Sequence, residues 1–236
     1  MALDKNSNGY TFMFAIILVV LVGASLAAVS FGLKPTQDKN EEIKKKMDIL
    51  GAINITTTRE KAEADYDTYV QTDKCVVLDA QGNVTDGVAF DIDIKKDYRD
   101  KTLAPENRKY PLFVATVDGS TKYIIPMVGS GLWGPIWGYV AVNEDKSSIY
   151  GAKFDHKGET PGLGAEIKQP GFYTQFESEV ISSGGAYQKI RVVKDGSGKS
   201  KQGAVDGITG GTITSKGVEE MLDRTLQVYV TYFSKN

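Results

Sequence analysis

Residues 206–214 read DGITGGTIT and lead directly into a stretch of helical periodicity at 215–233. Glycines permit tight turns and the close approach of a ligand to the backbone, and three threonine hydroxyls lie among them. A helix that follows such a turn presents unpaired amides and the positive end of its dipole, which together favour an anion. The stretch therefore suits a phosphate held at a helix start, through hydrogen bonds or through a threonine oxygen. The alternative is an ordinary glycine-rich turn with a cluster of capping residues.

The helix expected over 215–233 has one apolar face. Ser215 is its expected N-cap, and Glu219 and Glu220 are expected near the first turn, where the helix dipole favours acidic side chains. The apolar residues recur at helical spacing: Val218, Met221, Leu222, Leu226, Tyr229 and Phe233. We expect this face to pack against the protein core.

DGITGGT resembles the D-x-x-(S/T)-G-A-T motif, to which a bacterial flavin transferase attaches FMN through a phosphodiester bond. The closing threonine of that motif is the acceptor, and it corresponds to Thr212. Asp206, Thr209 and Gly210 match the other fixed positions, whereas Gly211 replaces the usual alanine. This change removes one methyl group, so we expect at most a weaker recognition by the transferase.

Two further segments strengthen the resemblance. ETPGLG, at 159–164, is similar to a stretch shared by C subunits of the sodium-pumping NADH:quinone reductase and G subunits of the Rnf complex. GLWGPIWGYVA, at 131–141, is closer to the C subunits, in which a GLWGP-type strand entry precedes the HxxETPGLG loop. The motifs cover residues 129–236 in this order, whereas residues 50–110 match only loosely. The chain is therefore identified as a member of the C-subunit family.

The resemblance implies an α+β fold, with a single N-terminal transmembrane helix followed by an extracytoplasmic FMN-binding domain of short antiparallel strands and helices. It also implies a subunit of a sodium-pumping NADH:quinone oxidoreductase that relays single electrons through FMN linked covalently to Thr212. No residue is expected to be catalytic or to bind a metal. The residues expected to bind the cofactor are Thr212, Asp206, Thr209, Gly210, Gly211, Thr214, Ser215, Glu159, Thr160, Gly162, Leu163, Gly164 and Trp133.

The roles of individual ring-contacting residues stay open at this point. Trp133 and Trp137 are candidates for stacking on the flavin ring, with aromatic packing in the core as the alternative. His156 and Glu159 are candidates for hydrogen bonds to the flavin, and either could instead stabilise its own loop. The implied partners are the other subunits of the complex, the flavin transferase during maturation and the lipid bilayer.

Composition excludes several other classes. The formal net charge is −2, and no cluster of lysine or arginine is interleaved with aromatic residues, so no nucleic-acid partner is expected. Cys75 is the only cysteine and His156 the only histidine. An intrachain disulfide, a cysteine-rich metal centre and a multi-histidine metal site are therefore impossible.

An uncharged apolar run at 11–33 is long enough to cross a membrane. The alternative is a cleaved signal peptide, but its apolar region usually has only ~7–15 residues, and only Lys5 is basic before the run. We therefore expect a cytoplasmic tail at 1–10, a retained helix at 11–33 that ends at Lys34-Pro35, and a charged linker or solvated helix at 34–56. The domain is expected at 57–236, with its FMN-binding region at about 129–236.

Two observations disagree about the side of the membrane on which the large domain lies. Several lysines follow the run (Lys34, Lys39, Lys44, Lys45 and Lys46), which by the positive-inside rule places the domain in the cytoplasm. Long domains can cross regardless of charge, and the resemblance places this one on the periplasmic side of a bacterial inner membrane, where the transferase acts.

Shorter patterns predict the remaining elements. Helices are expected near 59–70 and 170–182. Strands are expected at 74–84, where Cys75 packs as a small hydrophobe and a turn follows, and at 122–128, 138–143, 148–154 and 186–193.

Two nucleotide-binding motifs are rejected. GSGLWG at 129–134 fits the pattern GxGxxG, but Pro135 and a strand-like run follow instead of a helix. GKS at 198–200 lacks the glycine that a P-loop requires at position 193. Two alternatives to this family stay open: a G subunit of an Rnf-type complex, and a membrane-anchored binding module without a cofactor. Retention of flavin by the denatured protein separates the last from the others.

Overall fold

The computed structural model describes residues 7–235, without the side chain of Lys199. The predicted tail at 1–10 therefore lies mostly outside the described residues. The chain divides into two compact units, Met1–Lys44 and Lys45–Asn236, which are described separately below.

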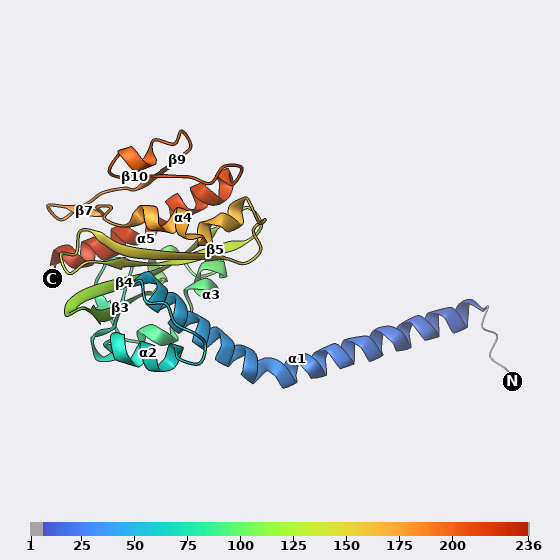
Figure 1. Cartoon of the computed structure of the whole chain (residues 1–236). Helices are drawn as coiled ribbons and strands as arrows, with labels where there is room; N and C mark the ends of the chain where they lie inside the picture. The colour runs from blue at the N-terminus through green and yellow to red at the C-terminus, as the bar shows by residue number, and fades with distance from the viewer. Residues whose placement is uncertain (1–6, 236) are drawn as a thin grey trace. The chain divides into compact units, whose positions relative to one another are not determined.

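The first unit consists of the N-terminal part of helix α1, Asn8–Ala52 (Figure 1). Among residues 7–235, α1 is the one helix that is long and apolar enough to cross a membrane, and none of its apolar window is buried within the protein. The predicted helix end at Lys34-Pro35 is wrong, because α1 continues through Pro35. A proline costs the helix one amide hydrogen bond, and the ion pair between Lys34 Nζ and Asp38 Oδ1 at 2.6 Å spans this point.

The last turns of α1 belong to the second unit. Ile49 and Leu50 are completely buried there. Lys45 Nζ donates hydrogen bonds to the carbonyl oxygens of Phe90 and Ile92, at 2.5 and 3.1 Å. Burial of its ammonium group lowers the pKa of Lys45 to about 8. The compact unit thus begins at Lys45, ahead of the predicted domain boundary at 57.

A six-stranded antiparallel sheet, in the order β2-β1-β3-β4-β5-β6, forms the centre of this unit. Its strands are β1 Val76–Leu78, β2 Val84–Thr85, β3 Tyr110–Val117, β4 Ser120–Ser130, β5 Pro135–Val142 and β6 Ile149–His156. The predictions for 122–128, 138–143 and 148–154 are confirmed as β4, β5 and β6. β3 was not predicted, and Cys75 lies just before β1 rather than within it.

Alternate residues of the sheet enter two separate cores. Ile125, Met127 and Phe154 pack on one face against the C-terminal helix. Ile124 and Tyr139 pack on the other face against the end of α1 and α2 (Ala62–Tyr69). Because side chains alternate across a strand, this arrangement buries both faces of the central strands, and Figure 1 shows helices on both sides of the sheet.

The remaining helices are short. The helix expected near 59–70 is confirmed as α2, whereas the one expected at 170–182 is reduced to α4 Pro170–Tyr173 and the 3-10 turn η5 Thr174–Phe176. Beyond η5 the chain turns at Glu177 and Ser178, where Ser178 has a φ of 67°, and Val180 then forms a bridge with Ser148 at the sheet edge. The other short helices are α3 Ile94–Arg99, η1 Thr72–Lys74, η2 Ala89–Asp91, η3 Pro105–Asn107, η4 Gly164–Lys168 and η6 Gly198–Ser200.

Two small sheets complete the fold. β7 Ser182–Ser183 pairs with β8 Ala186–Tyr187, and β9 Arg191–Val193 pairs in parallel with β10 Ala204–Asp206. The strand predicted at 186–193 is thus divided between β8 and β9. The predicted α+β class, with short antiparallel strands and helices behind an apolar N-terminal helix, is confirmed.

Helix α5, Thr212–Lys235, lies across one face of the sheet and buries its predicted apolar face. It begins at Thr212, so the predicted N-cap at Ser215 is wrong. The Ser215 amide already donates to Gly211 O at 2.9 Å, and its hydroxyl accepts the Ile208 N–H at 2.9 Å. Ser215 therefore closes the preceding turn. The first turn of α5 contains no acidic residue.

Tyr229 fastens the C-terminal part of α5 to the sheet. Its ring is completely buried, and its hydroxyl donates a hydrogen bond to Pro111 O in β3 at 2.7 Å. We expect Tyr229→Phe to lower the free energy of unfolding by about 1–2 kcal/mol, because it leaves a buried carbonyl without a donor. Denaturant unfolding of the full chain in detergent measures this change. Gln227→Ala, at an exposed position of the same helix, is the control and is expected to change stability by less than ~0.5 kcal/mol. Equal stability of both variants would contradict the assigned role.

Candidate functional site

The turn between β10 and α5 carries the DGITGGT motif. Asp206 fixes its entry: the Asp206 amide donates to Gln175 Oε1 at 2.9 Å, and its carboxylate Oδ1 accepts the Gly198 N–H at 2.8 Å. Gly210 has a φ of 74°, which favours glycine. The Gly211 amide closes the turn on Ile208 O at 3.0 Å. The chain therefore reaches α5 in one defined conformation.

Four hydroxyl groups lie in or next to this turn, and they differ in exposure. Thr214 and Ser215 are 1% and 4% exposed, and both hydroxyls are engaged inside the protein. Thr209 is exposed, and Thr212 is half-buried as the first residue of α5. Of the four, Thr212 is therefore the accessible hydroxyl that lies at a helix N-terminus. The first amides of an α-helix have no intrahelical acceptor.

A pocket of about 200 Å³ opens beside Thr212. It is lined by the end of β9, the turn and the first turn of α5: Val192, Val193, Lys194, Gly207, Ile208, Thr209, Gly210, Thr212, Ser215 and Lys216. Lys194 and Lys216 add positive charge to that of the helix end. The sequence did not predict Lys194 or the β9 wall, because β9 comes next to the turn only through its pairing with β10. Lys216 was missed although it follows Thr212 by only four residues.

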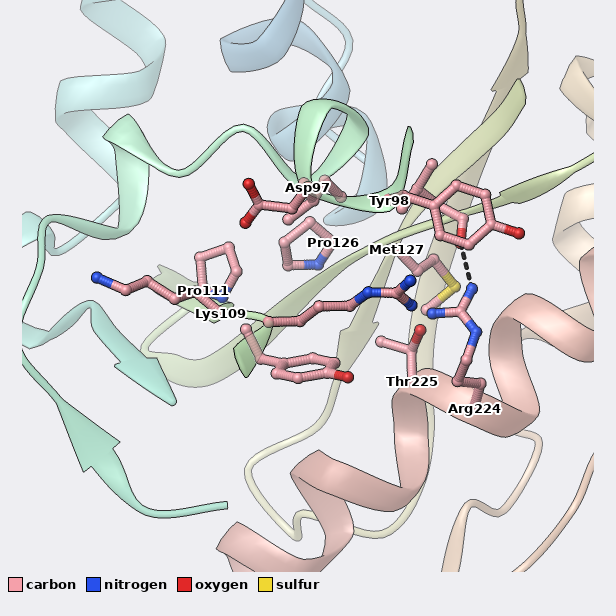
Figure 2. A pocket seen from close by; sticks show the side chains of 12 residues that line it. Asp97, Tyr98, Lys109, Pro111, Pro126, Met127, Arg224 and Thr225 are labelled. Atoms are coloured by element: carbon pink, nitrogen blue, oxygen red, sulfur yellow. Dashed lines mark hydrogen bonds between the residues drawn. The ribbon is translucent and has the colours of Figure 1, made fainter. Parts of the chain in front are cut away.

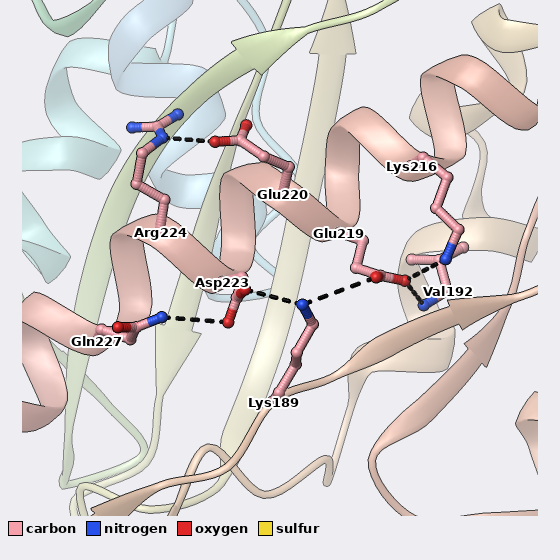
Figure 3. A network of polar contacts seen from close by, with 8 residues as sticks. All are labelled: Lys189, Val192, Lys216, Glu219, Glu220, Asp223, Arg224 and Gln227. Carbon is pink, nitrogen blue, oxygen red and sulfur yellow. Dashed lines mark hydrogen bonds and ion pairs between the residues drawn. The ribbon is translucent and has the colours of Figure 1, made fainter.

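A polar network fixes the pocket wall to α5 (Figure 3). Glu219 Oε2 accepts hydrogen bonds from the Val192 amide and from Lys216 Nζ, both at 2.7 Å. Lys189 Nζ lies 2.8 Å from Asp223 Oδ2 and 3.8 Å from Glu219 Oε1. Burial acts to raise the pKa of Glu219, but the bonds from Lys216 and Val192 hold that pKa below its usual value. The network therefore keeps its charge, and β9 stays in place.

Glu159 connects the other two predicted motifs to the start of α5. It is 5% exposed. Its Oε1 accepts the Trp133 N–H at 2.7 Å, and its Oε2 accepts the Thr214 hydroxyl at 2.5 Å. The Glu159 amide donates to His156 Nδ1 at 3.1 Å. Both His156 and Glu159 thus stabilise the loop, which is one of the two roles expected for them.

Three apolar side chains are exposed around these hydrogen bonds. Trp133 is 67% exposed, Ile213 57% and Leu163 41%. Leu163 lies against Gly210, where an added Cβ would come within 2.6 Å of Leu163 Cδ2. Core packing is therefore the wrong interpretation for Trp133. Trp137, in contrast, is partly buried and packs against the core on the face opposite α5, with Lys95 Nζ 3.4 Å from its ring centre.

The structure thus brings the three motifs together at one end of α5. The residues of the turn and helix start are Thr209, Gly210, Gly211, Thr212, Thr214 and Ser215, and those of the facing loop are Glu159, Thr160, Gly162, Leu163 and Gly164. Trp133 joins them through Glu159. Asp206 has a different role, because its carboxylate accepts the Gly198 N–H at the start of the turn.

Two other hollows lie elsewhere in the described part of the protein. One, between α3, β4 and α5, has a volume of about 30 Å³, enough for about one water molecule (Figure 2). There Arg108 and Arg224 both lie over the Tyr98 ring, with Cζ 5.5 and 4.9 Å from its centre, and Arg224 Nη2 donates to Val128 O at 2.7 Å. The other, about 630 Å³, is an open polar groove between η5 and η6. Neither contains a residue of the three motifs.

Comparison with known proteins defines the class first. The family model described as "FMN-binding domain" matches residues 131–227, a range that contains all three motifs. The chain is thus an FMN-binding domain that follows an apolar N-terminal helix.

The particular family follows from longer matches. The C subunit of the Na(+)-translocating NADH-quinone reductase from Vibrio vulnificus (strain YJ016) is 30% identical over 233 residues, which cover 93% of this chain and 89% of that protein. The crystal structure of the C subunit of the enzyme of the same name from Parabacteroides distasonis ATCC 8503 is 43% identical, with a TM-score of 0.76, over 85% of this chain and 96% of that one. The chain belongs to the family of the C subunits of Na(+)-translocating NADH-quinone reductases.

A second solved structure shares the fold. NqrC from Shewanella oneidensis is 22% identical, with a TM-score of 0.69, over 84% of this chain and 99% of that one. Family membership decides against both alternatives, the Rnf-type subunit and the module without a cofactor.

A substitution at Gly164 tests how tightly the site is packed. A Cβ at this position would collide with Glu159 Oε2 and would lie 2.5 Å from Thr214 Oγ1. We expect Gly164→Ala to destabilise the protein by about 1–3 kcal/mol and to speed hydrogen exchange of the amides at 211–216. Gly158→Ala is the matched control, since an added Cβ there meets nothing within 4 Å. Thermal unfolding with peptide-resolved exchange measures both effects, and wild-type exchange in Gly164→Ala would refute the packing argument.

Proposed function

We propose that this chain is the subunit of a sodium-translocating NADH:quinone reductase that carries FMN covalently on Thr212 and relays single electrons through it. The observation that carries the proposal is the position of Thr212, an accessible hydroxyl at the N-terminus of α5. Family membership and the match to an FMN-binding domain support the cofactor and the complex.

The residues around Thr212 fit a phosphoester. Its remaining negative charge would face the unpaired amides of the first turn of α5, which favour an anion. Lys216 lies one helical turn after Thr212, on the same side of α5, and lines the same pocket. Thr209 is also exposed, but it lies outside the helix and lacks these amides. The buried hydroxyls of Thr214 and Ser215 are poor acceptors because protein groups already bind them.

The size of the pocket indicates where each part of FMN would be held. Pockets that enclose a drug-sized ligand usually measure ~300–1,000 Å³, whereas this one measures about 200 Å³. It suits the phosphate and its polar chain. The exposed Trp133, Leu163 and Ile213 offer an apolar surface for the ring. When bound, FMN supplies one-electron redox chemistry, and these side chains would orient it and limit its contact with water.

The other parts of the reaction fall to partner subunits. NADH oxidation and quinone reduction need sites beyond a single flavin. Helix α1 has no charged residue between positions 11 and 33, so it is a poor path for Na⁺ and serves as an anchor. We place the domain on the periplasmic side, where the transferase of this resemblance acts, against the count of lysines after the span.

FMN attachment is tested on one peptide. Trypsin releases residues 202–216, and mass spectrometry should show one FMN phosphoester on it in cells with an active flavin transferase. Thr212→Ala should abolish the modification, because it removes the acceptor oxygen. Thr214→Ala is the control: it keeps the acceptor oxygen and should still carry FMN at the end point, although attachment is slower. An unmodified wild-type peptide in such cells would refute the proposal.

Membrane topology is tested with a protease. If the domain is periplasmic, protease added to intact spheroplasts should digest residues 45–236 and leave the anchor. Complete protection, with digestion in a lysed sample, would instead place the domain in the cytoplasm. Sequencing of the mature N-terminus checks that the apolar run is retained, and a start beyond residue 24 would show cleavage.

A further inference from the structure

We propose that Glu159 is a positioning residue for cofactor attachment, whose buried carboxylate holds the start of α5 in the conformation that presents Thr212. This inference rests on the proposed function, since it concerns how FMN comes to be joined to Thr212. It adds a role for a residue that does not itself receive the cofactor.

The contacts of Glu159 join three distant parts of the chain. Its Oε1 accepts an amide 26 residues away, at Trp133, and its Oε2 accepts a hydroxyl 55 residues away, at Thr214. Glu159 is 5% exposed, and Thr214 is 1% exposed. Hydrogen bonds to an ionised group are about twice as strong as neutral ones, so this carboxylate determines how the three segments meet.

Glycines leave room for the carboxylate and for little else. A Cβ on Gly131 would lie 2.5 Å from Glu159 Oε1, and a Cβ on Gly164 would collide with Oε2. Neither glycine has a positive φ, so neither position requires glycine for its backbone conformation. Close approach to the carboxylate is therefore the reason for glycine at both positions.

The electrostatics of α5 explain why an acid stands here. A buried carboxylate costs free energy unless it is paired and hydrogen-bonded. The first turn of α5 has no acidic residue of its own, and Glu159 supplies one from the facing loop. A carboxylate is stabilised at a helix N-terminus. This interaction ties the loop to the helix end, two residues from the acceptor.

The attachment reaction requires that geometry. Thr212 Oγ forms a P–O bond to an activated flavin phosphoanhydride, the anhydride P–O bond breaks as its other phosphate leaves, and the hydroxyl proton passes to a base on the transferase. Such a transfer needs the attacking and leaving oxygens nearly in line, and small misplacements are costly. If Thr214 were free to move, the first turn would fray and Thr212 Oγ would lose its fixed position.

The test compares attachment rates in the full-length chain. Each variant is expressed with a flavin transferase, and the fraction that carries FMN is followed over time by intact mass, beside the thermal unfolding midpoint. We expect Glu159→Ala to slow attachment about tenfold (~1.4 kcal/mol). Glu159→Gln should restore part of the rate and fall between Glu159→Ala and wild type, because its amide can accept from Trp133 and donate to the Thr214 oxygen but carries no charge for the helix end.

A matched control separates positioning from general stability. Glu179 also ties a loop by its carboxylate, with the Gly203 amide donating to Oε2 at 2.6 Å, but it lies away from Thr212. Glu179→Ala should lower the unfolding midpoint and leave the attachment rate unchanged. Equal rates in wild type and Glu159→Ala would overturn the inference. So would equal slowing by both alanine variants, since the effect would then be stability alone.

Two further results are decisive. If Glu159→Ala does not fold, Thr214→Val replaces it: this variant keeps the carboxylate but removes its hydroxyl donor, so slower attachment is expected and an unchanged rate overturns the inference. If wild-type protein carries no FMN on Thr212, the proposed function itself fails. Normal wild-type attachment with a normal rate in the Glu159 and Thr214 variants would overturn this inference alone.

Discussion

The close contact between α5 and β4 is the constraint on which the rest of the structure depends. An added Cβ on Gly129 would lie 2.9 Å from Met221 Cβ, and one on Gly217 would collide with Ser130 O. Because both positions are glycine, the helix and strand backbones approach without intervening side chains. Arg224 then donates to Val128 O at 2.7 Å. The N-terminal turn of α5 is thereby held where the β4–β5 and β6–η4 loops arrive.

The sequence predicted those parts of the site that are determined by residues close together along the chain. The apolar face of α5 and the DGITGGT turn are local patterns, and they were found correctly. The start of α5 was misplaced by three residues because Ser215 is a good N-cap, yet its hydroxyl accepts the Ile208 amide within the turn. β3 was missed, although it lies between β1 and β4 in the sheet.

Other features depend on long-range pairing and could not be found in this way. Val192 and Lys194 reach the site only because β9 pairs in parallel with β10. The joint contact of Glu159 with Trp133 and Thr214 has no local signal either. Pro35 indicated a helix end, but α1 continues through it, and the Lys34–Asp38 ion pair spans this point.

The two tryptophans of the chain stand in opposite environments. Trp133 is 67% exposed at the edge of the site, whereas Trp137 is packed on the other face of the sheet, beneath the ammonium group of Lys95. Indole emission depends on contact with water. A group that covers the site therefore changes the surroundings of one tryptophan and leaves those of the other as they are. Trp133 is therefore the tryptophan whose surroundings report whether the site is covered, whereas Trp137 keeps its protein neighbours.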